Sequence, residues 1–153
     1  LDLVFHLGDY IYEGRGNKQI REHLGDEIKS LDDYRIRYAQ YRSDPLLHGM
    51  HARCPWIVTW DDHEVDNNYA SDVSEEKGVD PFEFLKRRAN AYQAYYEAMP
   101  LRPRSLPRGP SLQLYRKIAF GRLAEFLVLD TRQYRSDQPN DDEPGPLAGG
   151  ALS

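Results

Sequence analysis

The sequence predicts an α/β fold in which helices pack in layers on a sheet. Short apolar runs rich in branched and aromatic residues alternate with longer segments whose apolar residues recur at helical spacing. In chain order these segments predict a strand, two helices, a strand, a helix and two further strands. Strands separated by helices are typical of a layered α/β sheet. The chain has 153 residues, 40% of them hydrophobic, which is enough to bury the core of one domain.

Four segments are expected to form strands. The apolar run at residues 1–7 ends at a glycine and is too short for a helix, so it predicts a buried strand. Residues 56–60 are aromatic and β-branched, and predict a second strand. Residues 112–118 alternate and residues 125–130 are apolar, which predicts two more strands with a turn at Gly121.

Three helices are expected between these strands. Ser30 is a candidate N-cap for a helix over residues 31–42, whose aromatic side chains share one face. A second, short helix is expected over residues 45–53, because proline is favoured at a first helical position. A third is expected over residues 82–99 and ends before Pro100. Irregular connections are expected over residues 13–29, 67–80 and 100–110.

Composition excludes several classes of protein. The balance of 20 Lys and Arg against 25 Asp and Glu gives a net charge of -5, the wrong sign for a protein that mainly binds phosphate backbones. No apolar run approaches the roughly 20 residues that a membrane-spanning helix needs. Cys54 is the single cysteine, which excludes an internal disulfide framework and an all-cysteine zinc site, and we expect it to be buried as a small hydrophobic residue.

The two ends of the sequence predict a partial domain. The chain begins without Met inside an apolar strand, and it closes in Pro- and Gly-rich material at residues 144–150. We therefore expect residues 1–153 to be the central part of a larger domain that is truncated at both ends. No signal peptide is visible, but in a fragment its absence says nothing about location.

The first candidate site follows the first strand. Asp9 and Tyr12 lie three residues apart, just after Gly8. A carboxylate can bridge two cations, and a phenol becomes a good ligand when a trivalent metal lowers its pKa. The alternative is a strand-to-loop turn in which Asp9 caps local amides and the tyrosines pack.

The second candidate site follows the second strand. Asp61, Asp62, His63 and Glu64 place three carboxylates and an imidazole in four residues. Burying such charges without a cation or several hydrogen-bond donors costs on the order of several kcal/mol per ion. His63 could be a metal ligand or a general acid. The alternative is a solvated turn that caps the following segment.

Taken together, the two acidic strand ends predict a metal-assisted hydrolase. Sites in α/β sheets gather at the carboxyl ends of strands, where ligands from different strands converge. We therefore expect the carboxylates of Asp9 and Asp62 to lie within a few ångströms of a shared point, as two-metal sites with ions about 4 Å apart require.

Several motifs resemble those of the alkaline phosphatase D family, the PhoD-like phosphatases. They run through nearly the whole chain in family order, and the string from Asp61 to Asn68 is the most specific. The motifs are Phe5–Glu13, Tyr38–Arg42, Thr59–Tyr69, Met99–Arg102 and Leu129–Arg135. The resemblance implies a calcineurin-like metallophosphatase fold, a β-sandwich flanked by helices, of which this chain is an incomplete central part. It also implies hydrolysis of small phosphate monoesters and diesters by a metal-activated water, with iron and calcium as cofactors, in an exported protein.

The resemblance also implies roles for individual residues. Asp9 matches the family's metal-bridging Asp, and Tyr12 matches the phenolate ligand of iron. Asp62 stands where metallophosphatases generally place an Asn ligand, and His63 matches the histidine that donates a hydrogen bond or proton to the substrate. The family's first metal-binding strand and its late His- and Asp-bearing segments are missing from this sequence. The metal site is therefore expected to be incomplete.

Two further residues are candidate substrate-binding groups, each with an alternative. Arg132 could reach a phosphate bidentately, or it could pair with Asp130 or Asp66. Asn67 could supply an oxygen to calcium or the substrate, or simply form a turn. For the protein as a whole, the alternatives to an enzyme are a non-catalytic calcium-binding module and an inactive fragment. No nucleic-acid or membrane partner is expected.

Overall fold

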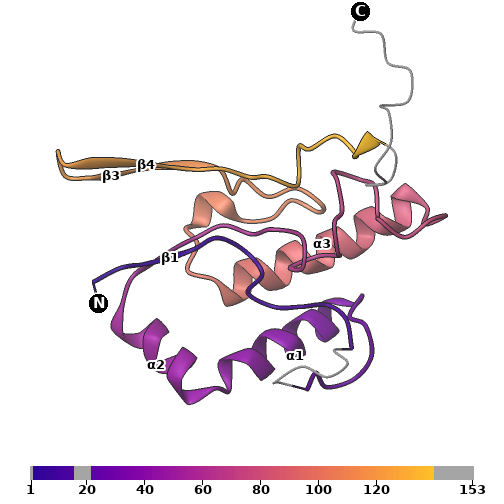
Figure 1. Ribbon diagram of the computed structural model, residues 1–153, viewed down its shortest axis with the longest axis horizontal. Helices are drawn as coiled ribbons and strands as arrows, with labels where there is room; N and C mark the ends of the chain where they lie inside the picture. Colours follow the sequence, from indigo (N-terminus) through magenta and orange to yellow (C-terminus); the bar gives the residue numbers. More distant parts are fainter. Residues whose placement is uncertain (1, 16–21, 140–153) are drawn as a thin grey trace, which may run out of the picture.

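The computed structural model describes residues 2–15 and 22–139, and it has the mixed α/β architecture that the sequence predicts. The elements follow one another in the expected order, with one additional short 3₁₀ helix, η1. They are β1 (Val4–His6), α1 (Leu31–Arg42), α2 (Pro45–Arg53), β2 (Trp56–Val58), α3 (Pro81–Ala98), η1 (Pro103–Ser105), β3 (Arg116–Phe120) and β4 (Ala124–Val128). In the view of Figure 1, α1 and α2 lie below β1, α3 runs to the right of it, and the hairpin of β3 and β4 lies above.

The strands form two small sheets. β1 and β2 pair in parallel, with Val4 opposite Trp56 and His6 opposite Val58. β3 and β4 form an antiparallel hairpin around the turn at Gly121, which has a φ of 56°. Because β1 and β2 are parallel, their carboxyl ends lie at the same edge, and the two acidic loops leave the sheet side by side.

The expected strand at residues 112–118 is displaced in the structure. The ladder begins only at Arg116, which lies opposite Val128, and it continues to Phe120. Leu112 and Leu114 precede it and are buried in the core. Their alternating pattern therefore records burial of an extended segment and not membership of a sheet.

The hydrophobic core packs α1 and α3 against the segments that follow β1 and β2. Ser30 caps α1 as predicted, and the capping is reciprocal: the Ser30 side chain accepts from the Asp33 amide, and the Asp33 side chain accepts from the Ser30 amide. The aromatic face of α1 is buried through Tyr34 and Tyr38, as expected. The Trp60 ring, which follows β2, stacks on Tyr92 of α3 with centroids 4.2 Å apart. Cys54 is also buried, as predicted.

A buried arginine holds the segment after β1 against α1. The Arg37 side chain is fully buried, and its Nη1 donates to the carbonyl oxygens of Tyr12 and Gly14, the latter at 3.0 Å. Buried carbonyl groups need donors, and a guanidinium supplies several in one plane. Arg37 therefore fixes the loop that carries Asp9, Tyr12 and the following residues.

One face of the expected buried strand is open. Phe5 and Leu7 line an apolar groove of about 480 Å³ between the parallel pair and β4, and 78% of Leu7 is exposed. Across this groove the rings of Phe5 and Phe126 are 4.9 Å apart. The expectation that residues 1–7 are buried is thus wrong for this face. Within residues 2–15 and 22–139, no helix is both long and apolar enough to cross a membrane.

Candidate metal centre

The first loop of the site requires a glycine. After β1 the chain turns through Gly8, with a φ of 115°, and Asp9, with a φ of 56°. A Cβ atom at Gly8 would lie 2.4 Å from the backbone nitrogen of Asp61. Only glycine therefore lets the loop after β1 lie directly against the loop after β2, and the positive φ of Asp9 follows from this tight turn.

The two loops bring three candidate ligands together. One ligand atom from each of Asp9, Asp62 and His63 lies within 4.8 Å of the other two. Within the described part of the chain, Oδ1 of Asp9 is buried without a hydrogen-bond partner. Burial raises the pKa of the Asp9 carboxyl above its usual value, and His63 opposes this rise. A buried carboxylate oxygen with no protein donor is suited to a cation.

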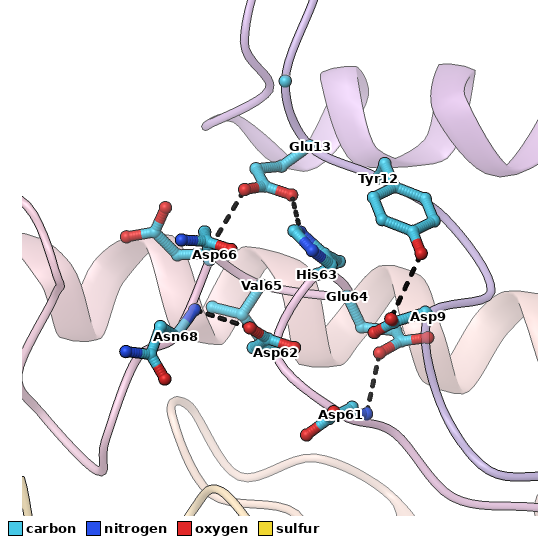
Figure 2. Close-up of polar contacts among 12 residues, drawn as sticks. Asp9, Tyr12, Glu13, Asp61, Asp62, His63, Glu64, Val65, Asp66 and Asn68 are labelled. Carbon is cyan, nitrogen blue, oxygen red and sulfur yellow. Dashed lines mark hydrogen bonds and ion pairs between the residues drawn. The ribbon is translucent and has the colours of Figure 1, made fainter. Parts of the chain in front are cut away.

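Tyr12 lies beside this group. Its hydroxyl donates to Oδ2 of Asp9 at 3.2 Å (Figure 2), and its ring is 4.3 Å from that of His63. Burial and the neighbouring Asp9 raise the pKa of Tyr12 to about 12. The phenol is therefore neutral at ordinary pH, and only a strong Lewis acid would make it an anionic ligand.

A carboxylate that sequence reasoning missed orients His63. Glu13 contacts His63 (Figure 2), with Oε2 of Glu13 at 2.7 Å from Nδ1 of His63. Burial lowers the pKa of His63, but the hydrogen bond and charge of Glu13 outweigh it and raise the pKa to about 9. For Glu13 itself, burial opposes ionisation, while the hydrogen bond to His63 holds its pKa below the usual value. The imidazole is therefore held as a cation with Nδ1 bonded to Glu13, which leaves the Nε2 N–H free to donate to an oxygen atom.

The second carboxylate, Asp62, is held by the turn that follows it. The backbone amide of Asn68 donates to Oδ2 of Asp62 at 2.6 Å (Figure 2). The other side-chain oxygen, Oδ1, lies 3.5 Å from Nη2 of Arg132. Asp62 is nearly buried, so these two donors determine its orientation.

Arg132 is placed at the edge of this cluster. Its Nε pairs with Oδ1 of Asp61 at 2.5 Å, and its Nη1 donates to Oδ1 of Asn68 at 3.2 Å. In the described part of the chain neither partner considered from the sequence forms an ion pair with the guanidinium, although the backbone amide of Arg132 donates to Oδ1 of Asp130 at 3.1 Å. Asp130 accepts from the indole of Trp60 at 3.0 Å, and Asp66 pairs with Arg87 at 2.9 Å.

Asn67 takes part in the turn through its backbone. Its amide donates to Oε1 of Glu13 at 3.0 Å, and its side chain donates to Glu75. Glu13 thus links His63 to the backbone of Asn67 by its two oxygens. A role of Asn67 in binding calcium or substrate stays a prediction.

Glu64 is the second residue whose place sequence reasoning missed. It was one of the carboxylates counted after β2, but its ligand atoms are not among those that converge. Its side chain is buried and accepts the Asp61 amide at 2.9 Å and the Tyr10 amide at 2.5 Å. A carboxylate directly after His63 was the available signal, but its neighbours could not be read from spacing alone.

Comparison with known proteins confirms the resemblance seen in the motifs. Residues 1–149 match the family model described as PhoD-like phosphatase. Alkaline phosphatase D of Bacillus subtilis (strain 168) is 59% identical over 152 residues, which cover 95% of this chain and 26% of that protein. A solved structure described as the structure of PhoD has a TM-score of 0.89 at 60% identity, over 94% of this chain and 28% of the other. The chain spans about a quarter of the length of these relatives, and it belongs to the PhoD-like phosphatase family.

Proposed function

We propose that this chain supplies part of the active site of a metal-dependent phosphoric ester hydrolase whose substrates are small phosphate monoesters or diesters. The observation that carries the proposal is the convergence of Asp9, Asp62 and His63, with a buried Asp9 oxygen that has no hydrogen-bond partner among the described residues. Family membership supports the reaction class. On this proposal the 153 residues are one part of a larger catalytic domain, consistent with their 26% share of the Bacillus subtilis relative.

The donor set fits hard cations, for which we propose iron and calcium. Carboxylates and a phenol suit trivalent iron, and carboxylate oxygens suit calcium. Asp9, with the bridging role that the family resemblance implies, would hold the ions together with Tyr12 and Asp62, and the remaining ligands would come from outside this chain. Bound cations of this kind supply Lewis-acid polarisation of the phosphoryl group and activate the water that attacks phosphorus.

His63 would act on the substrate through its free nitrogen. With Nδ1 held by Glu13, a proton on Nε2 can be donated to a phosphoryl or leaving-group oxygen. We propose Arg132 and Asn67 as further contacts of the substrate phosphate. The cationic group of Arg132 beside Asp62 supports its part in this arrangement.

The test uses the full-length protein and compares two acidic residues. Asp9→Asn removes a converging carboxylate, whereas Asp72→Asn changes an exposed one in the loop after β2. We expect Asp9→Asn to lose hydrolysis of p-nitrophenyl phosphate and of bis(p-nitrophenyl) phosphate together with bound metal, and Asp72→Asn to retain both. Chelation should abolish hydrolysis in the parent protein. Unchanged turnover in Asp9→Asn would reject the bridging role, and calcium-dependent melting without hydrolysis in the parent would favour a calcium-binding module.

On the basis of family membership we also propose a location outside the cytoplasm. Cell fractionation of the native organism, with detection by antibody, tests this directly. Recovery of the protein with cytoplasmic markers would reject it.

A further inference from the structure

A fully buried carboxylate links the two loops of the site. Only 1% of Glu64 is exposed. One of its oxygens, Oε1, accepts the backbone amide of Tyr10 at 2.5 Å, and the other, Oε2, accepts that of Asp61 at 2.9 Å. Figure 2 shows Glu64 between Asp9 and Asp61, below the ring of Tyr12.

This placement does not match the usual reasons for burying an acid. Across residues 2–15 and 22–139, no ion pair joins Glu64 to a basic side chain. Its ligand atoms are also outside the converging set of Asp9, Asp62 and His63. Burying a carboxylate that pairs with neither a basic side chain nor a metal ion costs free energy, and hydrogen bonds from backbone amides offset this cost here.

The partners of Glu64 are the amides that determine where the candidate ligands lie. Tyr10 directly follows Asp9, and Asp61 directly precedes Asp62. Tyr10 is 54 residues from Glu64 in sequence and Asp61 is 3 residues away. The Glu64 carboxylate therefore joins the loop after β1 to the loop after β2, in which Glu64 itself lies. A carboxylate has acceptors on both sides, whereas an amide side chain would present an NH₂ group to one of the two loops.

We propose that Glu64 is a positioning residue that clamps the loop after β1 to the loop after β2, and so sets the separation of Asp9 from Asp62 and His63. The proposal rests on the proposed function of these three residues as a metal and substrate site. Gly8 allows the two loops to approach, and Glu64 holds them at that approach. Partner residues outside a metal's direct ligands commonly change affinity about 10- to 100-fold when they are lost.

The test combines two substitutions in the full-length protein with readouts that do not need turnover. Glu64→Gln keeps the shape and removes one acceptor, and Glu64→Asp keeps the charge but is shorter by one methylene. Glu76→Gln, at an exposed position of the loop after β2, is the control. We expect both Glu64 variants to speed hydrogen exchange of the Tyr10 and Asp61 amides at least 10-fold in metal-free protein. At temperatures below the melting temperature, where the variants are folded, we expect their affinity for iron and calcium to fall at least 10-fold. We also expect kcat to fall by a larger factor than the change in KM.

The outcomes separate a positioning role from a merely structural one. Variants that lose thermal stability but keep wild-type amide exchange and metal affinity would overturn the proposal. If neither variant folds, the parent protein still decides the question, because fast exchange of its Tyr10 and Asp61 amides would exclude the clamp. A parent protein that shows slow exchange at both amides but neither binds metal nor hydrolyses esters would reject the proposed function and leave the clamp intact.

Discussion

Nδ1 of His63 and Oε2 of Glu13 are 2.7 Å apart, although the two residues are separated by 50 positions in the sequence. The same carboxylate accepts the Asn67 amide through its other oxygen. Glu13 therefore fixes both the plane of the imidazole and the turn behind it. The charge of Glu13 also keeps the proton on His63, since it raises the pKa of His63 to about 9 against the effect of burial.

Glu13→Gln should move the alkaline limb of the kcat/KM profile to lower pH. The neutral amide no longer stabilises the imidazolium, so the pKa of His63 falls and the acid form is lost earlier as pH rises. A pH series with p-nitrophenyl phosphate measures the shift, with Glu76→Gln as the exposed control. An unchanged limb would show that His63 does not act as the proton donor.

Tyr12→Phe should remove a visible charge-transfer band from iron-loaded protein. Burial and Asp9 hold the pKa of the free Tyr12 phenol at about 12, so only a bound trivalent cation would convert it to a phenolate. Absorption spectra at matched iron content measure the loss. Tyr115→Phe, at an exposed tyrosine, serves as the control. A band of unchanged intensity in Tyr12→Phe would assign the phenolate to another residue.

Gly8→Ala should destabilise the protein much more than Gly78→Ala. Both glycines have positive φ, for which a Cβ costs about 1 to 2 kcal/mol. Only at Gly8 would the added Cβ meet another chain segment, 2.4 Å from the Asp61 nitrogen, which adds about 1 to 3 kcal/mol of overpacking. Urea unfolding gives the two free energies. Equal losses at both positions would show that the loops separate without cost.

His51 should make the protein acid-sensitive at a place outside the metal centre. Its ring stacks on Trp56 at 3.8 Å, and its Nε2 lies 2.8 Å from the hydroxyl of Tyr10, which also accepts from Nε of Arg42. Burial, with Arg42 adding to it, lowers the pKa of His51 from 6.5 to about 4. The fold therefore favours neutral His51, and this stability is complete above pH 6.5 and is lost as pH falls toward 4.

The variant His51→Phe isolates this contribution because it keeps an aromatic ring on Trp56 and removes the acceptor nitrogen. The difference in unfolding free energy between the parent and His51→Phe should be largest above pH 6.5 and should shrink toward pH 4. Other acid-titrating groups cancel in this difference. A difference that stays constant over the range would contradict the assignment.

The helices were more predictable than the strands because their start signals are local. Ser30 and the Asp44–Pro45 pair mark the first residues of α1 and α2, and α3 begins at Pro81, one residue before the expected start. The ladder of β3 depends instead on its partner β4, so the alternation at residues 112–118 placed the start of the strand four residues too early and its end two residues too early.

In the site, the sequence predicted the convergence of strand-end carboxylates but not the residues that orient them. Asp9 and Asp62 follow parallel strands, and that topology brings them to one edge. Glu13 and Glu64 act through bonds to loops 50 and 54 residues away, which depend on the path of both loops at once. A count of acidic residues cannot distinguish a ligand from the carboxylate that holds it in place.

The groove between the parallel pair and β4 affects how this segment behaves in solution. Exposed fractions of 78% at Leu7, 69% at Leu127 and 65% at Leu129 place a row of leucines in water. A β-rich surface of this kind promotes self-association and precipitation. The segment expressed by itself is therefore poorly suited to binding or kinetic measurements. Measurements on the full-length protein avoid mistaking aggregation of the sample for loss of function.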